Sequence, residues 1–323
     1  MECRGGFGLL KTAGIHHITA YAQDVQSSVD FYAGLLGLRL IKQTVHFEAP
    51  DVYHLYFGNE FGQPGTILSL LCREDFPAGR LGGGQVGVIV FMVPAGGLLF
   101  WRQRLKKYKI DFMETRRFGR DYVRFTDLSG MLIDLVELEA GAVPEAARST
   151  VQGPIPEAYA IRGFDGVLLF SRKPDQTADV LELVLGLLYK DSEEGIARYE
   201  THGGLGSRID LSIEPIPAGA PGAGVVQHLA WRTSDASEQI LWQEQLKESG
   251  LDPTPAINME YYKTVRFREP GGILFQMATE VPGFQTDETA GELGRELMLP
   301  DKLEMQRSSI ERRLPEFQLR EFS

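Results

Sequence analysis

An internal repeat constrains the fold of this chain more than any other feature of its sequence. The segment FWRQRLK at 100–106 recurs as LWQEQLK at 241–247, and VRF at 123–125 recurs at 265–267. Each copy of VRF is followed by a glycine and then by a short apolar run. Self-similarity of this kind is typical of units that cannot bury an apolar face alone. The sequence therefore predicts repeated modules that pack against one another.

A second kind of unit alternates with the first. The tripeptide LGL occurs at 36–38 and at 185–187, upstream of the two copies of the first pattern. The order is A-B-A-B, and the units are expected to begin near Gly14, Gly84, Arg162 and Gly224. Each unit has the pattern of one strand, one helix and about three strands. We therefore expect an α+β fold of four tandem βαβββ modules.

The first unit shows the local signals behind this prediction. Its helix should be capped by Asp24, ended by Gly37 and buried along the face formed by Val25, Val29, Tyr32 and Leu36. The following strands, 53–57 and 66–71, are rich in aromatic, aliphatic and β-branched residues.

The chain divides into five predicted segments. They are a leader at 1–11, an N-terminal tandem half at 12–145, a linker at 146–160, a C-terminal tandem half at 161–283 and a tail at 284–323. Alanine, glycine and proline mark the linker. The tail should contain a helix around 302–314 that buries Leu303, Ile310 and Leu314. It would pack over the core or against a second subunit of a homo-oligomer.

The composition excludes several classes of function. A net charge of −11 argues against a surface for nucleic acid or anionic membranes. The two cysteines, Cys3 and Cys72, provide neither a disulfide framework nor a zinc ribbon, which favours a reducing compartment. No apolar run reaches the roughly 18 residues of a membrane span. We expect a cytoplasmic protein that acts on small molecules.

Two histidines lie at equivalent points of the first and last units. His17 is in GIHHIT at 14–19, and His228 is in VVQHLA at 225–230, so both are expected on the opening strand of a module. A repeat that brings two imidazoles to matching places suggests a shared metal. The alternative is a pair of hydrogen-bonded core histidines. Strand alternation places His16 on the face opposite His17.

The tandem modules resemble the vicinal oxygen chelate superfamily, which contains glyoxalases, bleomycin-resistance proteins and extradiol dioxygenases. From residue 12 onward the chain looks most like the hydroquinone-type ring-cleaving dioxygenases. The segments that carry this likeness are 14–19, 53–58, 64–67, 117–119, 282–284, 297–300, 310–311 and 314–315. The resemblance implies two incomplete-barrel halves, with the first and last units sharing the metal.

The resemblance also implies a ligand set of two histidines and a glutamate. The histidines fall on His17 and His228, but the glutamate position falls on Gln276. An amide oxygen can still coordinate, although it lacks the charge that strengthens metal binding. Glyoxalase I relatives use a glutamine ligand. Glu280 is too far along the strand to replace it, whereas Glu260 remains open as a substitute.

Several other positions near the site depart from the family. Gln227, Met259 and Arg266 stand where the relatives have a histidine, an arginine and a tyrosine, while His16 and Thr19 are retained. In the middle units, Gly87 and Gly166 replace the ligand histidines and Asp134 and Asp210 stand at the ends of the strands, so that half is expected to be structural.

Four further residues are candidates for catalysis: His16, Thr19, Tyr262 and Arg266. His16 would assist proton movement, Tyr262 would line the pocket or donate a proton, and Arg266 would bind an anionic substrate. Each has a packing alternative. Arg124 occupies the place of Arg266 in the other half, which favours a structural role for both.

The leading hypothesis is a metal-dependent, ring-cleaving dioxygenase of the hydroquinone or catechol type. It would use dioxygen and Fe(II), with Mn(II) or Zn(II) as alternatives, on a small aromatic or quinone-derived compound. Two rivals remain open because of Gln276. One is a glyoxalase-like lyase or isomerase with a redox-inert metal, and the other is a metal-free protein that sequesters an aromatic compound.

Overall fold

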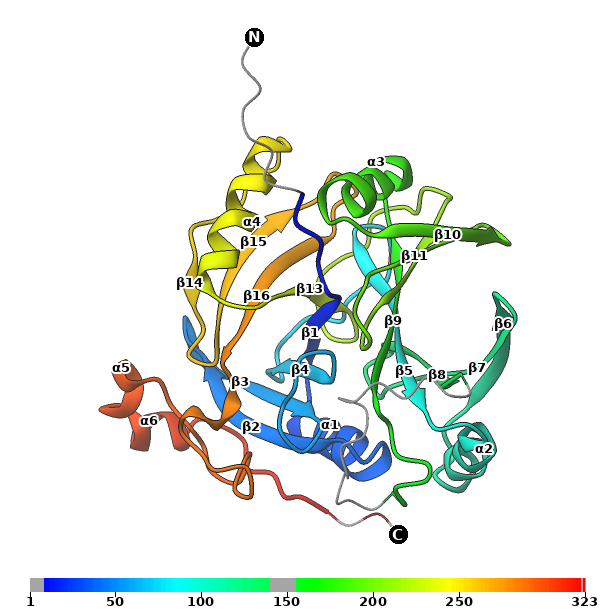
Figure 1. Cartoon of the computed structure of the whole chain (residues 1–323). Coiled ribbons are helices and arrows are strands. Elements are labelled where there is room, and N and C mark those ends of the chain that lie inside the picture. The colour runs from blue at the N-terminus through cyan, green and yellow to red at the C-terminus, as the bar shows by residue number, and fades with distance from the viewer. Residues whose placement is uncertain (1–8, 140–154, 321, 323) are drawn as a thin grey trace.

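The computed structural model describes residues 9–139, 155–320 and 322. Two curled sheets of eight strands each lie side by side, as Figure 1 shows. Four modules form them, each with a strand, a helix and three further strands. The modules begin at Ile15, Gln85, Gly163 and Val226, close to the predicted starts.

The first two modules supply eight strands and three helical segments. The first module comprises β1 (Ile15–Ala22), α1 (Val25–Val29), η1 (Asp30–Leu35), β2 (Arg39–His46), β3 (Ala49–Gly58) and β4 (Ile67–Cys72). The second comprises β5 (Gln85–Val93), α2 (Gly97–Lys107), β6 (Phe112–Arg117), β7 (Arg120–Thr126) and β8 (Leu132–Glu137).

The last two modules repeat this order, and a tail follows them. The third comprises β9 (Gly163–Phe170), α3 (Pro174–Asp179), η3 (Val180–Val184), β10 (Leu188–Glu193), β11 (Ile196–Glu200) and β12 (Arg208–Ser212). The fourth comprises β13 (Val226–Thr233), α4 (Ala236–Glu248), β14 (Ile257–Asn258), β15 (Tyr262–Arg268) and β16 (Leu274–Pro282). The tail contains η4 (Phe284–Thr286), α5 (Asp301–Glu304) and α6 (Arg307–Glu311).

The predicted signals of the first helix act as expected, with one difference. The Asp24 carboxylate accepts a hydrogen bond from the Ser27 N–H, and Gly37 follows the helix with a φ of +71°. The second half of this helix widens into a π-helical segment, in which the Leu36 N–H bonds to the Phe31 carbonyl. Such local widening is not visible in an apolar periodicity near 3.6 residues.

The four modules pair crosswise rather than in chain order. The first sheet, β14-β15-β16-β13-β1-β4-β3-β2, joins the first and fourth modules through the antiparallel pair β1–β13. The second sheet, β10-β11-β12-β9-β5-β8-β7-β6, joins the middle modules through β5–β9. The pairing of first and last units implied by the resemblance is therefore present.

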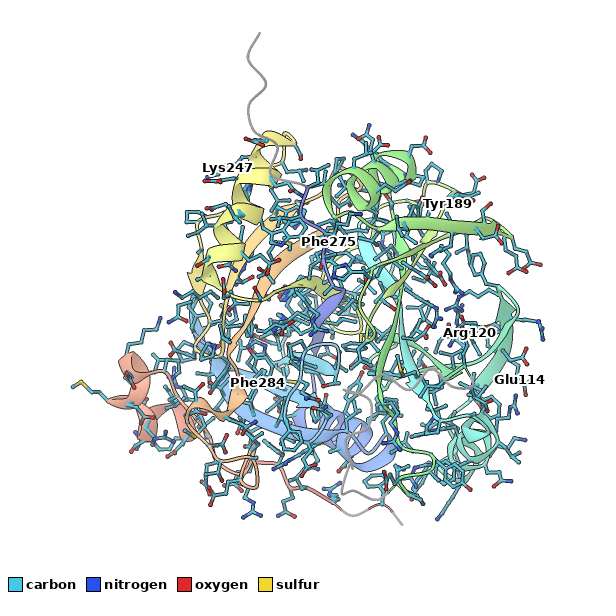
Figure 2. All side chains as sticks on the ribbon, viewed as in Figure 1. Glu114, Arg120, Tyr189, Lys247, Phe275 and Phe284 are labelled. Carbon is cyan, nitrogen blue, oxygen red and sulfur yellow. The ribbon has the colours of Figure 1, made fainter. Side chains whose placement is uncertain are left out.

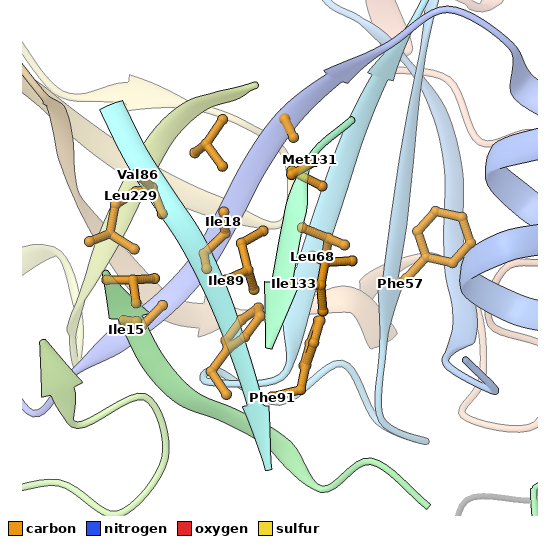
Figure 3. Close-up of a cluster of buried hydrophobic side chains, with 14 of the residues drawn as sticks. Ile15, Ile18, Phe57, Leu68, Val86, Ile89, Phe91, Met131, Ile133 and Leu229 are labelled. Atoms are coloured by element: carbon orange, nitrogen blue, oxygen red, sulfur yellow. The ribbon is translucent and has the colours of Figure 1, made fainter. Parts of the chain in front are cut away.

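The main apolar core lies between the two sheets. In Figure 3, Ile18, Leu68 and Leu229 of the first sheet approach Ile89 and Ile133 of the second, and all five side chains are fully buried. Polar side chains gather outside this core, as Lys247 on α4 shows in Figure 2. Because side chains alternate along a strand, the neighbours of these core residues point to the opposite face of the first sheet. We call that opposite face the inner face of the first sheet.

Two hydrogen bonds from helices to carboxylates at equivalent positions of the repeat connect the sheets. The Tyr32 hydroxyl donates to an Asp127 oxygen at 2.8 Å, and the Thr177 hydroxyl donates to a Glu269 oxygen at 2.7 Å. Each carboxylate also accepts backbone N–H bonds from its own turn. Each link thus holds a helix of one sheet against a strand connection of the other.

The tail packs on the first sheet. Lys42, fully buried on β2, forms ion pairs with Asp287 and Glu288. The prediction of one helix around 302–314 is wrong, because α5 and α6 are separate short helices. The expected burial of Leu303, Ile310 and Leu314 is confirmed. The predicted linker and leader fall largely outside the described residues, so the domain boundaries stay predictions. Among the described helices, none is both long and apolar enough to cross a membrane.

Candidate metal and substrate site

Strand register brings the predicted metal ligands to the inner face of the first sheet. His17 on β1 pairs with Ala230 on β13, and Ala230 pairs with Gln276 on β16. His228 lies two residues before Ala230 on the same strand and pairs with Thr19. Directly paired residues project to the same face of a sheet, and so do residues two apart on a strand. His17, His228 and Gln276 therefore share one face.

The two histidines face each other with their Nε2 atoms. The distance between these nitrogens is 3.0 Å, and both side chains are buried. Two nitrogens bound at about 2.1 Å to one octahedral ion, about 90° apart, would lie about 3.0 Å from each other. The spacing fits a shared metal. It equally fits a hydrogen bond in which one nitrogen donates.

The hydrogen bonds behind His228 fix its tautomer. Its Nδ1 lies 2.9 Å from the Gln227 side-chain oxygen, whose amide N–H in turn donates to the Tyr21 hydroxyl at 2.7 Å. An amide oxygen only accepts hydrogen bonds, so Nδ1 carries the proton. Nε2 consequently keeps a free lone pair directed at His17.

His16 does not lie on the opposite side of β1 from His17, and that prediction is wrong. A register irregularity between Ile15 and His17 interrupts the alternation, and the two imidazoles meet with their Nδ1 atoms 2.9 Å apart. Both rings contact Tyr262, at centroid distances of 5.5 and 4.8 Å. A bulge of this kind re-aims a side chain without changing the sequence pattern.

His16 lies behind His17, with the two Nδ1 atoms 2.9 Å apart. Because Nδ1 of His228 carries its proton, the 3.0 Å contact between the two Nε2 atoms is a hydrogen bond donated by His17. Nδ1 of neutral His17 then accepts a hydrogen bond from His16. A metal at Nε2 of His17 would require the other tautomer, in which Nδ1 of His17 donates to His16.

Burial keeps the histidines of this face in their neutral form. It lowers the pKa of His16 and His228 to about 3 and holds that of His17 and His54 well below 6.5. The nearby Arg266 lowers the pKa of His17, His54 and His228 further. Neutral imidazole is the form that binds metals, so no proton needs to leave before binding.

Gln276 presents an amide oxygen to the same face. The side chain is buried, and its oxygen accepts a hydrogen bond from the Thr264 hydroxyl at 2.7 Å, which leaves a second lone pair. Glu280 instead pairs with Arg232, and Glu260 is exposed. Within the described residues, no three His, Cys, Asp or Glu side chains form a group suited to a metal. A ligand set here requires the amide.

A hydrogen-bond chain, unforeseen in the sequence, links two of the predicted residues. It runs from Thr19 to Ser69 at 2.7 Å, to His54 at 3.1 Å, to Tyr56 at 3.1 Å and to Tyr262 at 3.3 Å. All five side chains are buried. His54 has no counterpart in the other modules and gave no signal through the repeat. Its spacing of two from Tyr56 on one strand was the available clue.

Burial keeps the two tyrosines of this chain protonated. It raises the Tyr262 pKa to about 12 and the Tyr56 pKa well above its usual value. A small pocket reaches the same region from outside and is walled by His54, Tyr56, Met259 and Tyr261, with Glu260 and Lys302 at its rim.

The matching face of the second sheet is filled by ion pairs. Arg117 bonds to Asp134 and to Asp210 at 2.8 Å each, and Arg124 and Arg198 each form paired bonds to one of these carboxylates. The register places Val88 and Gly166 at the histidine positions of this sheet, because Val90 pairs with Asp134 as Thr19 pairs with Ser69. The prediction is confirmed for Gly166 and wrong for Gly87, which lies one residue before the equivalent of His17. Neither Val88 nor Gly166 has a side chain that binds metals, which agrees with a structural role for the second sheet.

Known proteins match this architecture across its length. Residues 14–135 match the model of the Glyoxalase/Bleomycin resistance protein/Dioxygenase superfamily. A protein of Bacillus subtilis provisionally named a ring-cleaving dioxygenase, MhqO, is 45% identical over 96% of this chain and 98% of its own length. The chain belongs to this superfamily.

More distant relatives extend the comparison. The chlorohydroquinone/hydroquinone 1,2-dioxygenase of Sphingobium indicum is 29% identical over 91% of this chain and 93% of its own. A crystal structure from Bacillus subtilis, provisionally described as a dioxygenase, is 45% identical with a TM-score of 0.93 and covers 97% of this chain and 100% of its own. Glyoxalase I of Zea mays shares the fold alone, at 14% identity and a TM-score of 0.58 over 83% and 92%. These relatives place the chain among enzymes, as an oxidoreductase of the dioxygenase type.

Proposed function

We propose that this protein is a metal-dependent dioxygenase that cleaves the ring of a small aromatic diol of the hydroquinone or catechol type. The observation that carries the proposal is the pair of Nε2 atoms 3.0 Å apart, each with its other ring nitrogen engaged. The names of the full-length relatives support the reaction class.

His17, His228 and Gln276 would hold the metal, with Fe(II) as the first choice and Mn(II) or Zn(II) as alternatives. These residues fit such an ion, because three neutral donors on one face leave positions open for substrate oxygens and dioxygen. When bound, the metal would orient the substrate oxygen and activate dioxygen.

The surrounding side chains would bind the aromatic ring and handle its protons. Tyr262 stays protonated well above neutral pH and can therefore donate a hydrogen bond to a ligand oxygen beside His17. His16 would assist proton movement at His17, because the Nδ1 atoms of the two rings lie 2.9 Å apart. The hydrogen-bond chain from Tyr262 through Tyr56, His54 and Ser69 to Thr19 would carry protons between the two sides of the site.

One rival reaction has a specific observation in its favour. Gln276 is uncharged, and a neutral ligand suits the Lewis-acid chemistry of a glyoxalase-like lyase or isomerase as well as it suits oxygen activation. That reaction would proceed without oxygen. We further expect a cytoplasmic enzyme, since Cys72 is a buried free thiol.

Metal content and oxygen uptake test the proposal together. Protein purified without oxygen would be supplied with Fe(II), Mn(II) or Zn(II), and bound metal would be counted by mass spectrometry. About one metal per chain, lost in His228→Ala, and oxygen consumption with hydroquinone or catechol are the expected results. A metal-filled protein that turns over substrate without oxygen supports the lyase instead.

A metal-free wild type would contradict the proposal. Gln276→Glu is the matched control, because it restores the charge at the third ligand position. If only that variant fills with metal, the protein is a binding protein on an enzyme fold.

A further inference from the structure

The four modules place different residue pairs at one equivalent position. In each module, one residue of the third strand pairs directly with one residue of the last strand, and both side chains face the interior of the barrel. The pairs are Tyr56–Ser69, Arg124–Asp134, Arg198–Asp210 and Arg266–Gln276. The first pair contains an aromatic ring, the next two are ion pairs, and the last combines a cation with a neutral amide.

The two arginines at this position of the second sheet are neutralised by their partners. Arg124 binds Asp134 through two hydrogen bonds of 2.7 and 2.8 Å, and Arg198 binds Asp210 in the same way at 2.7 and 2.8 Å. Paired bonds of this kind satisfy both the charge and the planar donor geometry of a guanidinium.

Arg266 has no such partner. Its neighbour Gln276 is neutral and accepts from Thr264 instead. The Nε atom of Arg266 is buried without a hydrogen bond, and Nη2 lies 3.7 Å from the Met259 sulfur. Arg266 takes part in none of the ion pairs found in the described part of the chain. A buried donor left unsatisfied costs free energy, and an acceptor from outside would recover it.

The surroundings of Arg266 define what such an acceptor would look like. Met259 also walls the pocket that opens beside Tyr56 and Tyr261, so aromatic surface lies next to the guanidinium. The histidine pair lies on the same face, since Arg266 pairs with Gln276 in the row that contains His17. A flat ring carrying an oxyanion would meet all three features at once.

We propose that Arg266 binds the anionic oxygen of an aromatic ligand, so that the site selects aromatic monoanions over neutral analogues. The oxyanion is a carboxylate or a phenolate on the ring. This rests on the proposed function and sharpens it by assigning the charge of the ligand. It also argues against the structural role that the parallel with Arg124 suggested for Arg266, since only Arg124 has a carboxylate to hold.

The proposal implies that anion and metal strengthen each other. Three neutral ligands next to a free guanidinium give a site that repels a divalent cation, and a bound anion removes part of that repulsion. Binding free energies are reciprocal, so the metal should strengthen anion binding by the same factor.

Calorimetry on the metal-stripped full chain tests the proposal directly. The probes are benzoate, 4-nitrophenolate at pH 8 and the neutral benzamide, and the two anions distinguish the carboxylate from the phenolate. At least one anion should bind about tenfold more tightly than benzamide. Arg266→Met should remove this preference without weakening benzamide binding. Added Mn(II) should tighten binding of the preferred anion by about fivefold or more.

Two further variants keep the test decisive if Arg266→Met folds poorly. Gln276→Asp would recreate the pairing of Arg124 with Asp134 and should abolish the anion preference. Arg268→Met removes the same charge from the same strand at an exposed position and should leave the preference intact. The proposal is overturned if neither benzoate nor 4-nitrophenolate binds better than benzamide, or if the preference survives Arg266→Met. Loss of preference in Arg268→Met would overturn it too, by moving the anion to the cavity lined by Arg172 and Arg268.

This outcome is separable from that of the proposed function. Anion preference is measured without metal, whereas the dioxygenase proposal depends on metal content and oxygen uptake. Anion selection without oxygen consumption would leave Arg266 as the binding residue of a different reaction.

Discussion

At the scale of single residues, the sequence predicted that the two histidines of the pair would lie together, but it did not predict which side chains surround them. His17 and His228 occupy matching places in a repeat, and that symmetry carries positional information. His16 could not be placed, because the irregularity in β1 depends on how β13 pairs with it. His54 and Ser69 likewise owe their contact to the pairing of β3 with β4.

Replacement of Gln276 tests how much the missing charge matters. Gln276→Glu should raise the affinity for Mn(II) by about tenfold or more, because an anion beside a divalent cation adds electrostatic attraction. Gln276→Ala should lower the affinity below that of wild type. Isothermal titration with Mn(II) measures both. Equal affinities in wild type and Gln276→Ala would show that the amide is not a ligand.

The buried histidines predict an acid-sensitive fold. Burial lowers the pKa of His16 and His228 to about 3 in the folded protein, and it holds the pKa of His17 and His54 well below the 6.5 of the free side chain. Below pH 6.5 the unfolded chain therefore binds more protons than the native one, and the free energy of unfolding falls as the pH falls. Each histidine contributes up to about 1.4 kcal/mol per pH unit.

Urea denaturation of metal-free protein between pH 7.5 and 5.5 measures this slope. His228→Gln removes one titrating group and should flatten it. A variant whose slope equals that of wild type would contradict a depressed pKa for His228.

At the scale of elements, periodicity and end signals recovered the strands and most helices of the repeat. They failed where tertiary contacts decide the outcome. The tail was expected to form one helix because its apolar spacing is continuous, but the helix is interrupted between Glu304 and Arg307. The π-helical second half of the first helix was missed for a similar reason, since its wider turn leaves the apolar face buried.

The ion-paired strands of the second sheet give a stability prediction. Asp134→Asn should lower the free energy of unfolding by about 3 to 5 kcal/mol, because it leaves Arg124 and one bond of Arg117 without a buried counter-charge. Urea denaturation measures the loss. Asp121→Asn is the control, as it removes an exposed partner of Arg116 and should cost less than about 1 kcal/mol. Equal losses in the two variants would contradict a dominant role for burial.

At the scale of the whole molecule, the repeat predicted four modules but not how they pair from residues alone. Either neighbouring or crosswise pairing satisfies the apolar patterns, and the family resemblance was needed to choose. The structure shows one physical basis for the choice in two links between the sheets, Tyr32–Asp127 and Thr177–Glu269. Both join modules that are adjacent in the chain but belong to different sheets.

Loss of one link should weaken the contact between the sheets. Tyr32→Phe removes a buried hydrogen bond to Asp127 and should cost about 1 kcal/mol, and Thr177→Val should cost a similar amount. The double variant should show additive losses, because the two links share no partner. Strong non-additivity in denaturation experiments would indicate that the links act as one unit.

The pairing of β1 with β13 also sets an order in time. As the chain leaves the ribosome, His17 emerges early on a strand whose partner edge has not yet been made. His228 follows only with the last module, and Gln276 arrives on the final strand of the sheet. Because domains fold as their parts emerge, the site is completed only after the last module has been synthesised, when the tail alone is still to follow. A nascent or truncated chain that lacks the last module would therefore contain most of the strands but no complete set of metal ligands.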